Sequence, residues 1–249
     1  NSANITQNIL INDDVDPTAP AMADLGPYAC YADIPVQNIL DVVGETDNCG
    51  GAVTVAFVSD GPNPGCSGTV VRTYSLTDVC GNSANITQNI LINDNVDPTA
   101  PAMADLGPYA CYADIPVQNI LDVVGETDNC GGTVTVAFVS DGPNPGCSGT
   151  VVRTYSLTDV CGNSANITQN ILINDDVDPT APAMADLGPY ACYADIPLQN
   201  ILDVVGETDN CGGAVTVAFV SDGPNPGCSG TVVRTYSLTD ICGNSANIT

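Results

Sequence analysis

The sequence predicts an all-β chain built from three tandem antiparallel β-sandwiches, and three observations support this fold class. The hexapeptide NSANIT begins at residues 1, 82, 163 and 244, so the 249-residue chain repeats every 81 residues. A unit of that length is too long for one turn of a solenoid and suits a small independent domain. Within each unit, short segments rich in β-branched residues alternate with turn clusters containing Gly, Pro, Asn and Asp, which is typical of a sandwich.

The strands of the first repeat can be placed from their residue patterns. Residues 52–60 and 69–78 are rich in Val, Thr, Tyr and Phe, and residues 84–94 alternate isoleucine with Asn and Thr. A further strand is expected near 38–46. No window combines helical periodicity with capping residues, so no α-helix is predicted.

The repeat boundaries follow from the acidic, proline-containing stretch after each final strand, which we interpret as a linker. The predicted repeats span 19–94, 100–175 and 181–249, joined by linkers at 14–18, 95–99 and 176–180. Residues 1–13 match the last strand of a preceding repeat, and the third repeat lacks most of its own. We therefore expect an array that continues in both directions; the alternative is a pilin-like subunit that exchanges this strand with a partner.

The charge balance excludes several classes of function. The chain has 29 acidic residues, three arginines and no lysine or histidine, for a net charge of −26. Nucleic acid is not expected as a partner, because phosphate binding needs clustered Lys and Arg. No stretch approaches the ~20 apolar residues of a membrane helix, so we expect no direct membrane insertion. Without histidine or lysine for proton transfer or an activated nucleophile, we expect no enzyme.

Four cysteines per repeat predict disulfides formed in an oxidising, extracellular setting. Zinc is the weaker alternative, because the chain has no Cys-x-x-Cys pair and no histidine. Three pairings are possible within a repeat. If the strands bracketed by these cysteines are the B and F strands of an immunoglobulin-like sandwich, they run in the same direction in opposite sheets, which favours one pairing. The predicted bonds are Cys30–Cys66, Cys49–Cys80, Cys111–Cys147, Cys130–Cys161, Cys192–Cys228 and Cys211–Cys242.

Several motifs carry a family resemblance. The stretches TDNCGG and DPTAP recur in each repeat, and GCSGTVVRTYSLTDVCGNSANITQ recurs in the first two, with Ile241 for the valine and an end at Thr249 in the third. Together they closely resemble the bacterial HYR-like (hyalin-repeat-like) domain. That module is repeated in giant surface adhesins of gliding bacteria and in proteins exported by the type IX pathway. The resemblance implies an immunoglobulin- or fibronectin-III-like fold and a role in adhesion or cell-surface architecture. It implies no catalytic activity and no particular ligand.

The acidic linkers are candidate calcium sites. In the expected topology each linker enters its repeat beside two acidic loops, and carboxylates held so close together repel unless a cation is present. Calcium accepts about six to eight oxygen ligands from Asp, Asn and backbone carbonyls. The alternative is a hydrated linker whose Asp and Asn side chains cap turns. The candidate ligands are Asp14, Asp16, Asp47, Asn48, Asp78, Asp97, Asp128, Asp178 and Asp209.

The arginines predict an ion pair within each repeat, and the near identity of the repeats indicates a structural role. Arg72 shares a strand face with Val70 and Tyr74, so we expect a buried stem and an ion pair within its own repeat, in preference to a ligand-binding role. Near-identical repeats fit an extracellular cell-surface stalk or filament, whose partners are adjacent identical repeats. The main alternative is a multivalent array that binds protein or polysaccharide through many weak sites.

Overall fold

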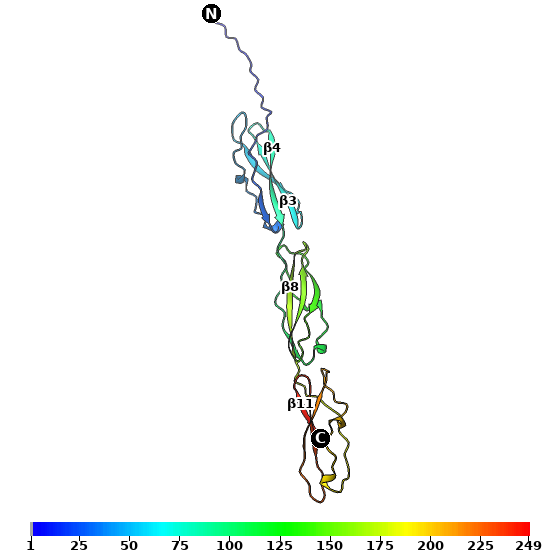
Figure 1. The fold of residues 1–249 in the computed structure, drawn as a ribbon. Coiled ribbons are helices and arrows are strands. Elements are labelled where there is room, and N and C mark those ends of the chain that lie inside the picture. Colours follow the sequence, from blue (N-terminus) through cyan, green and yellow to red (C-terminus); the bar gives the residue numbers. More distant parts are fainter. Residues whose placement is uncertain (1) are drawn as a thin grey trace. The chain divides into compact units, whose positions relative to one another are not determined.

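The structure is a computed structural model that describes residues 2–249, and its regular elements in that range are strands and short 3-10 helices (Figure 1). The predicted all-β fold class is confirmed, with three repeats of sandwich-like architecture. Among the described residues, no helix is long and apolar enough to cross a membrane.

Each of the first two repeats is organised around one four-stranded sheet. The strands of the first repeat are β1 (Leu25–Tyr28), β2 (Thr54–Asp60), β3 (Ser67–Thr77) and β4 (Ser83–Asn93). Their order in the sheet is β1-β4-β3-β2; β1 is parallel to β4, and the other pairs are antiparallel. The second repeat forms the same sheet from β5 (Leu106–Tyr109), β6 (Thr135–Asp141), β7 (Ser148–Thr158) and β8 (Ser164–Asn174). The predicted strands at 52–60, 69–78 and 84–94 are therefore confirmed.

The third repeat has a smaller sheet. It contains β9 (Thr216–Asp222), β10 (Arg234–Thr239) and β11 (Ser245–Ile248), in the order β11-β10-β9. Here β10 has 6 residues, whereas β3 and β7 each have 11.

The second layer of each repeat is largely irregular. In the first repeat it contains the 3-10 helices η1 (Tyr31–Asp33) and η2 (Ile39–Asp41); the later repeats contain η3 (Tyr112–Asp114), η4 (Ile120–Asp122), η5 (Tyr193–Asp195) and η6 (Ile201–Asp203). Val42 from this layer packs against Tyr74 and Leu76 of the sheet. The prediction of a strand near 38–46 is wrong. The Asn38 side chain accepts a hydrogen bond from the Leu40 amide (3.1 Å) and so begins the 3-10 helix η2.

The core lies on the inward face of the long hairpin formed by β3 and β4, which run side by side in Figure 1. Val70, Tyr74 and Ile90 are fully buried on this face. Because side chains alternate across a strand, the apolar residues of both strands point into the same layer.

Arg72 lies in the same buried row, with 2% of its surface exposed. Its Nε donates to Asp60 Oδ1 (2.7 Å), and a terminal nitrogen donates to Asp60 Oδ2 (2.9 Å) and to the Pro35 carbonyl (2.8 Å). The hydrogen bond to Asp60 raises the pKa of Arg72. The predicted ion pair within the repeat is confirmed, and Arg153–Asp141 and Arg234–Asp222 repeat it.

Replacing Arg72 with Met should destabilise the first repeat by about 2–4 kcal/mol, because it leaves the Asp60 carboxylate without its partner. The measurement is the midpoint of urea unfolding. The double variant Arg72→Met/Asp60→Leu removes both charges and should recover part of the loss. If Arg72→Met unfolds at the wild-type urea concentration, the ion pair does not support the fold.

The compact units of the structure do not coincide with the sequence repeats. The first unit contains the residues up to Thr99 together with two segments of the second repeat, Glu126–Thr135 and Leu157–Ala165. The second unit contains Ala100–Gly125, Val136–Ser156 and Asn166–Thr249. Each unit therefore includes one complete connection between consecutive repeats.

Candidate functional site

Two disulfides in the first unit join the first repeat to loops of the second. Cys30, which precedes η1, is bonded to Cys130, and their Cα atoms are 5.1 Å apart. Cys66, which precedes β3, is bonded to Cys161 with a Cα separation of 5.3 Å. Both separations are ordinary for disulfides. The two repeats are thus covalently cross-linked at two points besides the main chain.

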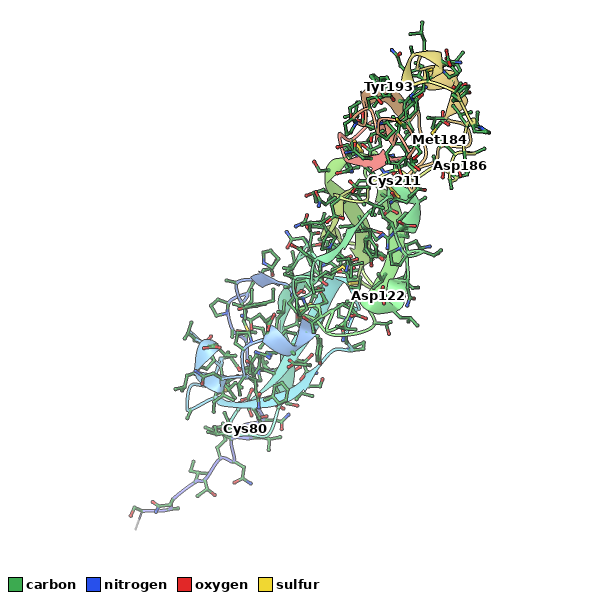
Figure 2. All side chains as sticks on the ribbon, turned by 90° about the horizontal axis from the view of Figure 1, so that it is seen from below. Cys80, Asp122, Met184, Asp186, Tyr193 and Cys211 are labelled. Atoms are coloured by element: carbon green, nitrogen blue, oxygen red, sulfur yellow. A yellow bond between two sulfur atoms is a disulfide. The ribbon has the colours of Figure 1, made fainter. Side chains whose placement is uncertain are left out.

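The second unit contains the same cross-links one repeat later. Cys111 is bonded to Cys211 (labelled in Figure 2), and Cys147 is bonded to Cys242. We call each pair of disulfides, with the linker it spans, a junction. Among residues 2–249, four exposed cysteines remain as thiols: Cys49, Cys80, Cys192 and Cys228.

The predicted pairing within repeats is wrong. It comprised Cys30–Cys66, Cys49–Cys80, Cys111–Cys147, Cys130–Cys161, Cys192–Cys228 and Cys211–Cys242, and none of these bonds is present. Cys30 and Cys66 do lie near each other, since both line one hollow, but Cys130 and Cys161 line it too. The short linker allows these two loops of the next repeat to reach Cys30 and Cys66, so each thiol finds its partner across the junction.

A pair of carboxylates lies at each junction. In the first unit, Asp94 and Asp128 each offer an oxygen, and the disulfide-bonded Cys130 its sulfur, to a group of atoms that lie within 4.8 Å of one another. Asp94 Oδ1 accepts from the Val96 amide (3.3 Å), and Asp128 Oδ2 accepts from the Cys130 amide (2.9 Å). The remaining oxygens, Asp94 Oδ2 and Asp128 Oδ1, are buried and have no hydrogen-bond partner.

An equivalent carboxylate pair occurs at the start of each of the three repeats. Asp13 with Asp47, and Asp175 with Asp209, also have one unpartnered, buried oxygen on each residue. All three arginines are bonded to other aspartates, so none of these side chains neutralises the pairs. Two carboxylates at such a distance repel by on the order of 3 kcal/mol at an effective dielectric constant of ~20. The residues therefore fit a hard cation with oxygen ligands, such as calcium.

The predicted ligands divide into four groups in the structure, the last of which is Asp78 alone. Asp47, Asp128 and Asp209 belong to the carboxylate pairs. Asn48 lies beside one pair and donates to Asp13 Oδ1 (3.3 Å). The linker residues Asp14, Asp16, Asp97 and Asp178 are exposed and belong to none of the metal-ligand groups found among the described residues.

Asp78 holds its own loop together. It is buried, with Oδ1 accepting from the backbone amides of Cys80 (2.9 Å) and Asn82 (2.9 Å) and Oδ2 accepting from the Asn82 side chain (2.9 Å). Burial opposes its charge, but these hydrogen bonds lower the pKa of Asp78. Asn82 also donates to the Asp13 carbonyl (3.2 Å), which ties the incoming chain to this loop.

Sequence reasoning missed Asp13, Asp94 and Asp175, although two signals mark them. Ile90, Ile92 and Asp94 occupy alternate positions and are all buried, so Asp94 continues the inward face of β4 beyond its end. Asp also occupies this position in all three repeats, whereas the next residue is Asp14, Asn95 or Asp176.

The unpaired thiols of the first repeat lie beside the same acidic group. Removal from water, followed by the charge and hydrogen bonding of Asp13, raises the pKa of Cys49. The pKa of Cys80, labelled in Figure 2, is raised by the same causes. Because the thiolate is the reactive form, a raised pKa leaves a smaller fraction of each thiol in that form at neutral pH.

A family model described as "HYR-like domain with 4 cysteines" matches residues 13–92, 95–173 and 178–249. Among solved structures, mouse cadherin-23 EC22–24 is 14% identical, with 94% of this chain and 97% of that chain covered and a TM-score of 0.33. The protocadherin gammaB7 EC3–6 cis-dimer is 14% identical, with coverages of 94% and 76% and a TM-score of 0.31. Drosophila N-cadherin EC1–4 is 12% identical, with coverages of 96% and 75% and a TM-score of 0.29. No curated protein matches the chain.

Proposed function

Because the chain belongs to the family of HYR-like domains with four cysteines, we propose that it is a load-bearing segment of an extracellular stalk in a bacterial surface adhesin. In this role the repeats are mechanical spacers without catalytic activity, and their partners are neighbouring repeats of the same kind. The observation that carries the proposal is the pair of disulfides across each junction.

The disulfides provide a short covalent path through the chain. From the first residues, tension passes through Cys30–Cys130, along the main chain to Cys147, and through Cys147–Cys242 to the last residues. This path bypasses residues 31–129 and 148–241, so unfolding of these regions adds no length to it. A spacer must keep its length under load, whereas a flexible tether lengthens. Stretching the oxidised chain tests the proposal.

We further propose that calcium binds the carboxylate pairs Asp13/Asp47, Asp94/Asp128 and Asp175/Asp209. Two observations support this: one buried oxygen of each carboxylate lacks a hydrogen-bond partner, and Asp94 and Asp175 are more than nine-tenths buried. The remaining ligands would come from water and from neighbouring backbone. A cation would cancel the repulsion of the pair and stiffen the connection between repeats.

Calcium should raise the unfolding temperature of the chain, because a ligand that binds only the folded state stabilises it by about 2.7 kcal/mol at a hundredfold excess over its Kd. Differential scanning calorimetry with calcium and with chelator measures this effect. Asp94→Asn should abolish the calcium response of the first junction. In chelator the same variant should be at least as stable as the wild type, because repulsion with Asp128 is lost.

Asp97→Asn is the matched control, since it removes an exposed linker carboxylate three residues away. It should retain the calcium response. Loss of the response in Asp97→Asn but not in Asp94→Asn would assign the ion to the linker instead, and an unfolding temperature that calcium does not change would contradict the site altogether.

A further inference from the structure

An aliphatic patch lies on the surface of the first repeat, in and just after the 3-10 helix η2. Its members Ile39, Leu40 and Val43 are exposed over 46%, 76% and 67% of their surfaces, while the neighbouring Val42 packs in the core. Together with Val55 of β2, these residues line a hollow of about 430 Å³. Large aliphatic groups gathered around a hollow on the surface are typical of a site that another molecule covers.

The patch is a property of the repeat and does not depend on the position of the repeat in the chain. The second repeat has a neighbouring repeat on both sides. Its equivalent residues Ile120, Leu121 and Val124 are exposed over 43%, 76% and 66% of their surfaces, and Val123 is buried. The third repeat has the same five residues at 201–205. Each repeat therefore presents one aliphatic patch.

A free sheet edge lies beside the hollow. β2 is the last strand in the order β1-β4-β3-β2, so its outer edge has no strand partner among the residues that the structure describes. It contains neither lysine nor proline, which commonly block such an edge. A bulge between Phe57 and Ser59 leaves Thr54–Phe57 as the regular stretch, and this stretch includes Val55 of the hollow. An added strand would thus find backbone partners next to the aliphatic patch.

The charges around the patch indicate which kind of molecule fits it. Asp41 is exposed within the patch sequence, and Glu45 lines the hollow. Asp122, the counterpart of Asp41 in η4, is labelled in Figure 2. The three arginines of the chain are all bound to other aspartates, and the chain has no lysine or histidine. A second copy of the chain would therefore bring like charges together, whereas a cationic molecule would be attracted.

We propose that each repeat binds an extended, cationic segment of a partner protein. The segment pairs with the outer edge of β2 along Thr54–Phe57, places alternate apolar side chains on the aliphatic patch, and compensates Asp41 and Glu45 with its Lys or Arg residues. In such strand addition, main-chain hydrogen bonds supply affinity and the alternate side chains supply specificity. The proposal goes beyond the spacer role, and it involves neither the junction disulfides nor the carboxylate pairs.

The test is isothermal titration calorimetry of the oxidised chain with a peptide of alternating valine and lysine, seven residues long like β2. One peptide should bind per repeat, hence three per chain, and hydrogen exchange of the β2 amides should slow. Peptides with serine for valine, with glutamate for lysine, or with a methylated backbone should each bind at least tenfold more weakly. Equal affinity for the serine peptide or the methylated peptide would show charge attraction alone and overturn the proposal.

Variants of the exposed residues locate the site. The variant Leu40→Thr/Leu121→Thr/Leu202→Thr should weaken binding at least fivefold, and Glu45→Gln/Glu126→Gln/Glu207→Gln should reduce the salt dependence of Kd. The matched control is Val71→Thr/Val152→Thr/Val233→Thr, which changes exposed valines outside the hollow and should bind like the wild type.

Two results with the leucine variant would contradict the proposed partner. Unchanged affinity for the valine–lysine peptide would place binding away from the aliphatic patch. Sedimentation velocity without peptide gives the second result: if the wild-type chain self-associates and the leucine variant does not, a second copy of the chain covers the patch instead of a cationic segment.

Discussion

Stretched between its two ends, the oxidised chain should reach only about a fifth of the length of the reduced chain, at ~3.5 Å per extended residue. The covalent path through Cys30–Cys130 and Cys147–Cys242 leaves only the first residues, the segment between Cys130 and Cys147 and the last residues free to extend. This corresponds to roughly 180 Å, against roughly 870 Å for the reduced chain. The reason is topological, so the result does not depend on how strongly each sheet resists force.

Force spectroscopy with handles at the two ends measures these lengths directly. After addition of reductant, the chain should extend to its full length, and the force–extension curve should show the unfolding of the sheets. Cys242→Ser should lengthen the oxidised chain, because the path must then pass through other bonds, whereas Cys49→Ser removes an unpaired thiol and should leave the length unchanged. An oxidised chain that extends nearly as far as the reduced one would exclude the proposed load path and, with it, the proposed spacer.

Much of the fold could be predicted from the sequence because the information is local. The alternation of apolar and polar residues along 84–94 fixes both the strand and its buried face, and β4 follows it closely. Arg72 was placed correctly for the same reason: it lies in an inward row, and a buried guanidinium needs a carboxylate. The error at 38–46 is also local, since a capping Asn38 outweighs the strand propensity of the residues around it.

The junctions could be predicted only in part, because they depend on contacts between residues about 100 positions apart. The number of cysteines and the acidic character of the linkers indicated disulfides and a possible cation site. Which sulfur meets Cys30 is decided by where the loops of the next repeat lie, and the spacing of four cysteines within one repeat does not encode this. Nor did the density of carboxylates in the linker distinguish Asp14, which is exposed, from Asp13, which pairs with Asp47.

Mild acid hydrolysis should cut the chain at its Asp–Pro bonds, yet leave the three large fragments joined until a reductant is added. These bonds are acid-labile and occur at Asp16–Pro17, Asp97–Pro98 and Asp178–Pro179, one in each linker. The cuts give residues 17–97, 98–178 and 179–249, plus a short N-terminal peptide that contains no cysteine. Both disulfides of each junction span the cut made there, so the fragments stay together. Acid also suppresses the thiolate, which prevents exchange during digestion.

Electrophoresis of the digest with and without reductant distinguishes disulfides across junctions from disulfides within repeats. With bonds across junctions, the unreduced digest migrates near the intact chain, and reduction gives three fragments of similar mass. Cys130→Ser/Cys161→Ser should release residues 17–97 alone without reductant, because it removes both bonds of the first junction. Cys49→Ser/Cys80→Ser changes the equivalent positions one repeat earlier and should release no large fragment. Three separate fragments from the unreduced wild type would restore the pairing within repeats and remove the covalent basis for transmitting load across the junctions.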